Sequence, residues 1–279
     1  NLFLSAGVLG LLPHTMTFPT AAEAQVAVRA AAEAAAEGSE EGEADVAVDH
    51  VVASVSQDWE AELWMLMRSL HNVLEEMRTG LASACLVQIY VSSAAEWAMA
   101  AIAEQTLAYC ARAGREARPL VTCAVVPRLP KDGLVEVAVI CGEAGEEPTA
   151  LAGGGHLSAT ASASSRGAPG GAVCVAEVST GAGGSAVEEL ADECLRRLAS
   201  QCAAAAWAEV QRRSSGGPVS ASLLVQYAVA DAHVVVEEAV EASLAELGAA
   251  SSCVPSFMPV TSLLPRCYLR ITALVSVVA

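Results

Sequence analysis

One carboxylate inside an otherwise apolar segment is the first candidate for chemistry in this sequence. The stretch ARPLVTCAVVPRLPKDGLVEVAVIC is typical of two short strands, over 120–126 and 134–141, joined by a Leu-Pro-Lys-Asp-Gly turn. Glu136 lies between two valines in the second of these strands. A carboxylate at such a position is either an edge residue that faces water or a reactive group in a pocket, and the residues alone leave both interpretations open.

The elements that would position this strand pair occur twice along the chain. In the first half, the segment AELWMLMRSLHNVLEEM has helical spacing of its apolar residues, and it precedes a strand, CLVQIYV, and a helix over about 94–112. In the second half, helices over 187–210 and 233–247 flank the strand SLLVQYAV, and a strand pair closes the chain. The segment LVQIYV at 86–91 matches LVQYAV at 224–229, which indicates an internal repeat.

This repeat predicts an α+β chain of two tandem modules, each a mixed sheet packed by two helices. We expect the first module over 1–145, with a low-complexity insertion rich in Ala, Glu and Gly at about 20–58. A flexible linker is expected over 146–171, with room in it for the first strand of the second module. The second module is expected over 172–279.

Composition excludes several classes of partner. The 279 residues carry 32 acidic against 15 basic side chains, a formal charge of −17, and no basic cluster that could follow a phosphate backbone. No apolar run is long enough to span a bilayer, and the opening segment lacks the basic residues of a signal peptide. Nine cysteines without a C-x-x-C pair and five histidines without ligand spacing favour reduced core thiols over a disulfide framework or a metal site. The sequence therefore predicts a cytoplasmic protein without nucleic acid, membrane or metal as partners.

The order helix, strand, helix and strand pair, with RLPKDGLVEV at the turn, resembles the RidA family, also called the YjgF or L-PSP endoribonuclease family. The opening LSAGVLGLLPHTMTFP is similar to the first signature of that family. The resemblance implies RidA-like (chorismate-mutase-like) modules that assemble as trimers with pockets between neighbouring modules. For this chain it implies a homo-oligomer or a pseudo-trimeric assembly.

Two such modules in tandem resemble the C-terminal region of the eukaryotic diphthine–ammonia ligase family. That resemblance implies a parent protein that amidates diphthine on translation elongation factor 2 with ATP, so elongation factor 2 is an expected partner through the parent. The ATP would bind a synthetase domain that we do not find in these residues, so no cofactor is expected in this chain. By itself the chain is not expected to form the amide.

The resemblance also points to residues in the first module. In active RidA proteins, an arginine about nine residues before the turn proline holds the carboxylate of a 2-imino acid, and a glutamate in the following strand helps to position water. Glu136 matches the glutamate and is the candidate catalytic residue. Val121 stands where the arginine is expected, and Arg118 is the nearest arginine and a candidate ligand-binding residue. Ser5, in the opening signature, is a further candidate for lining a pocket.

In the second module Ser256 stands at the arginine position, and Arg270 is placed by counting where the glutamate would be, as a candidate ligand-binding residue. Neither module alone carries the full pair. The leading hypothesis is therefore a binding and assembly region. The alternative is a 2-imino acid or enamine deaminase that uses Glu136 with a displaced arginine, and the older family name suggests a ribonuclease, which the charge of −17 disfavours.

Overall fold

The computed structural model describes most of the chain, in two compact units. One unit comprises residues 3–141, and the other comprises residues 142–279 with residues 1–2. We call them the first and the second unit. The structure describes residues 2–4, 8–11, 16–36, 55–113, 119–142, 151–152, 159–168, 171–180, 192–214, 219–228, 233–264 and 267–277.

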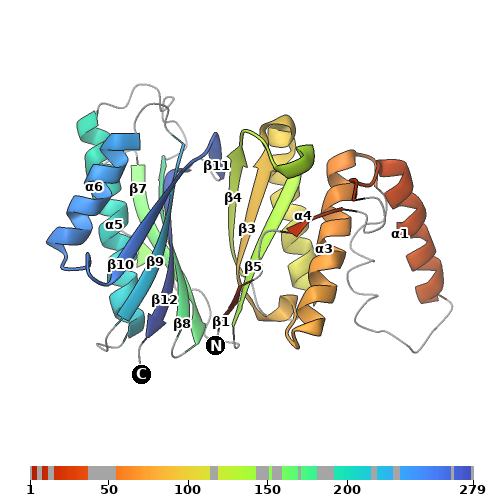
Figure 1. Cartoon of the computed structure of the whole chain (residues 1–279), viewed down its shortest axis with the longest axis horizontal. Helices are drawn as coiled ribbons and strands as arrows, with labels where there is room; N and C mark the ends of the chain where they lie inside the picture. Colours follow the sequence, from red (N-terminus) through yellow and green to blue (C-terminus); the bar gives the residue numbers. More distant parts are fainter. Residues whose placement is uncertain are drawn as a thin grey trace. The chain divides into compact units, whose positions relative to one another are not determined.

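The first unit is a small mixed sheet with helices on one side (Figure 1). Strand β3 (Ala84–Ser92) runs parallel to β4 (Leu120–Val126) and antiparallel to β5 (Val135–Gly142), and the short strands β1 (Leu2–Leu4) and β2 (Val8–Leu9) pair with β5. Its helices are α1 (Ala21–Ala36), α3 (Asp58–Glu76) and α4 (Met99–Ala113), with 3-10 turns η1 (Leu81–Ser83), η2 (Ser93–Ala98) and η3 (Pro130–Asp132). Helix α1 packs against α3.

Helix α3 forms because both its start and its spacing favour it. Gln57 and Glu60 make a capping box at its N-terminus, in which the Glu60 carboxylate accepts the Gln57 amide hydrogen at 3.0 Å. The apolar residues of the helix recur every three or four positions, so one face enters the core. The large side chains of that face that are fully buried are Leu63, Trp64, Leu66, Met67 and Leu70.

The second unit has a longer sheet in the order β10-β9-β12-β8-β7-β6. Only β9 and β10 are parallel among these pairs. Helices α5 and α6 cover one face of the sheet (Figure 1). The elements are β6 (Leu151–Ala152), β7 (Ala159–Ala168), β8 (Gly171–Thr180), α5 (Asp192–Ser214), β9 (Val219–Tyr227), α6 (His233–Glu246), β10 (Cys253–Pro259), β11 (Ser262–Leu264), which pairs with β12, and β12 (Cys267–Val277).

The two units repeat one strand arrangement. In each, a central strand (β3 or β9) has a parallel neighbour (β4 or β10) and an antiparallel one (β5 or β12), and the latter pairs antiparallel with an earlier strand (β2 or β8). A helix precedes the central strand and another follows it in both units. The prediction of an α+β fold with two modules, each a mixed sheet packed by two helices, is confirmed.

The two low-complexity ranges also contain regular structure. Helix α1 occupies Ala21–Ala36 within the expected insertion at 20–58, and residues 37–54 lie outside the described part of the chain. Strands β6 and β7 lie within the expected linker at 146–171. None of the helices in the described ranges is both long enough and apolar enough to cross a bilayer.

Candidate functional site

Glu136 lies on the face of the first sheet that points away from the helices. The thiol of Cys141, on the same strand β5, interacts electrostatically with that of Cys110 in α4, so the odd-numbered residues of β5 face the helices. Val135 and Val137 are fully buried on that side. Glu136 therefore projects from the opposite face, where it is half-buried, and this burial raises the pKa of its carboxyl above the usual value.

The strand register shows which residues surround Glu136. Tyr90 of β3 and Leu9 of β2 are its direct neighbours across the sheet. Gln88, two residues before Tyr90 in β3, lies on the same face of the sheet and is opposite Thr122 of β4. We call Gln88, Tyr90, Thr122 and Glu136 the polar face of the first unit. These side chains provide a carboxyl, two hydroxyls and an amide. None of the four is positively charged.

Arg270 is the other predicted site residue that the structure describes. It lies in β12, between Glu177 of β8 and Gln226 of β9 in the strand register. Its side chain is 0% exposed, and Nε donates a hydrogen bond to Glu177 Oε1 at 2.5 Å. Since Leu269 and Ile271 belong to the core beneath α5 and α6, Arg270 lies on the opposite face of the sheet.

This guanidinium is consequently part of a buried polar cluster. Two further side chains of the same face, Gln226 and Thr272, are almost completely buried. The carbonyl oxygen Oε1 of Gln226 and the hydroxyl Oγ1 of Thr272 have no hydrogen-bond partner in the described structure. Glu177 neutralises the charge of Arg270 locally. The cluster therefore consists of a structural ion pair and two neighbouring polar side chains that each have an unsatisfied hydrogen-bonding atom.

The register also refines how the two units correspond. If Gln88 and Gln226 are equivalent, as the matched segments require, then Ala138 opposite Gln88 corresponds to Arg270 opposite Gln226. Arg270 is therefore two residues further along its strand than the position of Glu136, which corresponds to residue 268. Counting from the turn prolines gave a different equivalence because the prolines are not equally spaced from this position: Pro130 is six residues before Glu136, and Pro265 is three residues before residue 268. Ser5 and Arg118, the remaining predicted ligand-binding residues, lie outside the described residues.

Glu62 is a buried carboxyl that the sequence analysis did not single out. It lies in α3 and is 3% exposed, and its Oε2 accepts the backbone amides of Leu134 at 2.7 Å and Val135 at 3.4 Å. Burial raises the pKa of the Glu62 carboxyl to about 7, and the nearby charge of Asp58 contributes to the same shift. The contact anchors α3 to Leu134 and to Val135, the first residue of β5, directly before Glu136.

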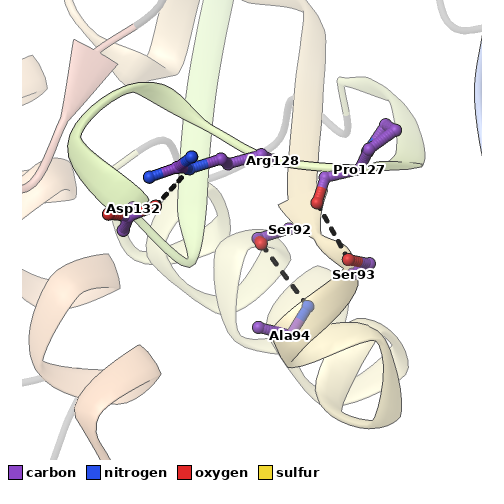
Figure 2. A network of polar contacts seen from close by, with 6 residues as sticks. All are labelled: Ser92, Ser93, Ala94, Pro127, Arg128 and Asp132. Atoms are coloured by element: carbon purple, nitrogen blue, oxygen red, sulfur yellow. Dashed lines mark hydrogen bonds and ion pairs between the residues drawn. The ribbon is translucent and has the colours of Figure 1, made fainter.

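The turn that leads into β5 is held by a second set of contacts, shown in Figure 2. Ser93 Oγ donates a hydrogen bond to the carbonyl of Pro127 at 2.9 Å, and Arg128 forms an exposed ion pair with Asp132. The amide of Ser92 donates to the carbonyl of Leu134 at 2.9 Å. These contacts attach both ends of the turn to Ser92 and Ser93, where β3 ends. They therefore determine where β5 begins.

Lys131 and Asp132 within this turn have φ angles of 57° and 62°, a region that residues other than glycine rarely occupy. Their conformation is held by the hydrogen bonds from Asp132 N to Leu129 O and from Gly133 N to Pro130 O. Phe18 packs so closely on Gly133 that a Cβ there would lie 2.7 Å from the ring. The Pro-Lys-Asp-Gly sequence therefore serves a tight, sterically demanding turn.

Metal binding is not supported by the part of the chain that the structure describes, since it contains no group of three His, Cys, Asp or Glu side chains that could hold a metal ion. The seven described cysteines are all buried, and none of them forms a disulfide. Burial raises the pKa of the Cys110 thiol to about 12 and that of the Cys141 thiol to about 11. Neither thiol is therefore activated as a nucleophile at neutral pH.

No family model and no curated protein matches the sequence. Among solved structures, the chain is similar to the YjgF gene product of E. coli, with 16% identity over 50% of this chain and 80% of that one, at a TM-score of 0.32. RidA from the Antarctic bacterium Psychrobacter sp. PAMC 21119 has 18% identity over 50% and 80% of the two chains, at a TM-score of 0.32. A putative endoribonuclease L-PSP from Entamoeba histolytica has 18% identity over 50% and 78%, at a TM-score of 0.31.

Proposed function

We propose that this chain is a binding and assembly region rather than an independent catalyst, and that it is the tandem RidA-like region of a diphthine–ammonia ligase-like protein. The observation that carries the proposal is the pairing of Arg270, whose side chain is fully buried, with the partly exposed Glu177. A guanidinium that already binds a carboxylate inside the fold would have to give up that partner before it could bind the carboxylate of a substrate. Leaving a buried charge without its partner costs several kcal/mol, so the exchange is unfavourable.

The polar face of the first unit leads to the same conclusion by a different route. An imino acid that docks beside Glu136 would bring a second carboxylate close to the first. The register neighbours Tyr90 and Leu9 offer no positive charge to compensate for desolvating either group. This face is better suited to amines, amides or hydroxyls, which can donate to the Glu136 carboxylate and accept from Tyr90 or Gln88.

The deaminase alternative rests on one observation in its favour, the raised pKa of the half-buried Glu136 carboxyl. A carboxyl with a raised pKa is suited to general acid–base catalysis near neutral pH. This alternative requires a cation near Glu136, for which Arg118 is the first candidate. A ribonuclease is disfavoured by the formal charge of −17, because RNA binding depends on phosphate contacts from Lys and Arg.

An assay of ammonia release from enzymatically generated 2-imino acids tests the proposal. We expect the chain and its Glu136→Ala variant to match the uncatalysed rate of imine hydrolysis, with Glu76→Ala, an exposed change in α3, as the control. Turnover that Glu136→Ala abolishes and Glu76→Ala leaves intact would overturn the binding-region proposal. Arg118→Ala would then show whether that arginine supplies the cation.

The assignment to a diphthine–ammonia ligase-like protein can be tested separately, from the sequence of the gene. The reading frame upstream of Asn1 is expected to encode an ATP-binding synthetase domain with a Ser-Gly-Gly-Lys-Asp-Ser type sequence. If no such domain is encoded, the diphthine–ammonia ligase assignment is withdrawn and the binding-region proposal is judged by the assay alone. The described cysteines, which are buried and form no disulfide, are compatible with the proposed cytoplasmic location, where thiols stay reduced.

A further inference from the structure

Strand β10 is at one end of the sheet of the second unit, and its backbone shows which groups face outward. Its single partner strand among the described residues is β9, to which it runs parallel over Cys253–Pro259 (Figure 1). In a parallel pair, successive residues of a strand direct their amide and carbonyl groups alternately toward the partner strand and away from it. Such an outward row of groups is a template for the addition of another strand.

Two hydrogen bonds, one at each end of the β9–β10 pair, show which residues of β10 direct their backbone groups toward β9. The amide of Ala221 donates to the carbonyl of Ser252 at 2.8 Å, and the amide of Val260 donates to the carbonyl of Tyr227 at 3.0 Å. Even-numbered residues of this stretch therefore direct their groups toward β9, and the register between these two bonds continues without a shift. The odd-numbered residues, 253, 255, 257 and 259, direct theirs away from it.

Of these four outward positions, two are prolines and have no amide hydrogen, namely Pro255 and Pro259. The amide of Cys253 is already used, since it donates to the carbonyl of Ala249 at 2.9 Å. Phe257 is left as the outward position in β10 whose amide can serve an added strand. The equivalent strand β4 contains no proline in its sequence LVTCAVV, so the two prolines are a feature of β10 and not of the module.

From this geometry we infer that Pro255 and Pro259 close the β10 edge of the second unit to strand addition. An added strand would find outward carbonyls to accept its hydrogen bonds but a single amide to donate one back, so three of the four hydrogen bonds that β10 would normally donate would be missing. The edge needs such protection because its side chains do not supply it. Val254 is 69% exposed and Ser256 is also exposed, and neither residue carries a charge that would repel another strand. Any partner that binds at this edge must therefore contribute side-chain donors rather than a strand.

The test restores the missing amides without adding apolar surface. The Pro255→Thr/Pro259→Thr variant of the complete chain returns two outward donors. The control, Val254→Thr/Ser256→Thr, changes exposed side chains of the same strand whose amides already point toward β9. Mass is measured by light scattering after size-exclusion chromatography over a concentration series, and backbone exchange is followed by hydrogen–deuterium mass spectrometry.

We expect the proline variant to associate further, to at least about twice the mass of the unmodified chain at the same concentration, while the control keeps the mass of the unmodified chain. The Phe257 amide should become protected in the associated form. The inference is overturned if the proline variant keeps both the mass and the Phe257 exchange of the unmodified chain. It is equally overturned if the control associates to the same extent, because side chains would then drive association.

If the Pro255→Thr/Pro259→Thr variant does not fold, hydrogen–deuterium exchange of the unmodified chain tests the inference instead. The Phe257 amide is expected to exchange more than about tenfold faster than the amides of Val254 and Ser256, which point toward β9. If the Phe257 amide is protected as strongly as they are, a strand or another donor-and-acceptor partner already covers this edge, and the inference fails.

Discussion

The buried carboxyl of Glu62 allows a quantitative prediction for the pH dependence of stability. Its folded-state pKa is raised from 4.5 to about 7, chiefly by burial. Because the folded pKa is higher than the unfolded one, the folded state binds the proton more tightly. The stability of the first unit is therefore greatest below about pH 4.5 and falls as the pH rises to about 7, where the carboxyl ionises in the folded state.

The perturbation that isolates this effect is Glu62→Gln. Both backbone amides, of Leu134 and Val135, donate to the same oxygen of Glu62, so the single carbonyl oxygen of glutamine can retain both contacts. The charge, however, is removed. A pKa shift of this size corresponds to roughly 3 kcal/mol once the carboxyl is fully ionised, of which about 2 kcal/mol develops between pH 5 and pH 8.

We expect Glu62→Gln to match the unmodified chain at pH 5 and to be more stable by about 2 kcal/mol at pH 8. The measurement is urea unfolding from pH 5 to pH 8 in a Trp207→Phe background, since the three remaining tryptophans all belong to the first unit. Glu76→Gln is the matched control, because Glu76 is an exposed glutamate in the same helix. It should leave the pH dependence unchanged.

Two results would refute this reasoning. If Glu62→Gln and the unmodified chain lose stability in parallel as the pH rises, ionisation of Glu62 does not limit the stability of this unit. If Glu62→Gln is less stable by several kcal/mol at every pH, the carboxylate contributes more through its charged hydrogen bonds than it loses through burial. In that case the folded pKa would lie below 7.

Three further predictions concern packing and the buried polar groups. Gly10→Ala should destabilise the first unit by roughly 3 kcal/mol or more in urea unfolding, because its Cβ would lie 2.1 Å from the backbone oxygen of Glu62. Cys110 should not react with a thiol reagent such as Ellman's reagent until guanidinium is added, because burial raises the pKa of its thiol to about 12. Arg270→Ala should cost roughly 2 to 4 kcal/mol by leaving Glu177 without its partner, and Arg270→Met combined with Glu177→Gln should recover much of that loss in the same measurement.

The strands of the first unit could be predicted closely from sequence because turn residues bracket them. The predicted strand over 120–126 has the observed bounds of β4, Leu120–Val126, and the predicted strand over 134–141 differs by one residue at each end from β5, Val135–Gly142. Proline and glycine mark these boundaries because they fix or free the backbone locally. The information needed was within a few residues of each boundary.

Helix starts were predicted less well because their signals are weaker. The helix expected from about residue 94 begins as the 3-10 turn η2 at Ser93–Ala98, where Ser92 Oγ accepts the amide of Ala94 at 3.4 Å, and α4 follows from Met99. Apolar spacing cannot distinguish three from 3.6 residues per turn over so short a stretch.

The partners of the buried polar groups could not be predicted at all. Glu62 meets its amide partners 72 and 73 residues later, and Arg270 meets Glu177 across 93 residues. Both contacts depend on strand order and register, which no local pattern specifies. Glu136 could be singled out because it interrupts a run of valines, whereas Glu62 occurs in a helix that contains several other glutamates.

The repeat predicts two equivalent modules, but the chemistry of their equivalent faces differs. On the second sheet, Arg270 and Glu177 neutralise each other within the fold, and Gln226 beside them is buried. On the first sheet the corresponding position opposite Gln88 is Ala138, so the equivalent glutamine has no guanidinium beside it in the register and remains partly exposed. A polar group that is partly exposed and not paired across the sheet can exchange water for a ligand at lower cost than one that is already buried and paired. If one of these two faces binds a small molecule, it is therefore the face of the first unit, around Glu136.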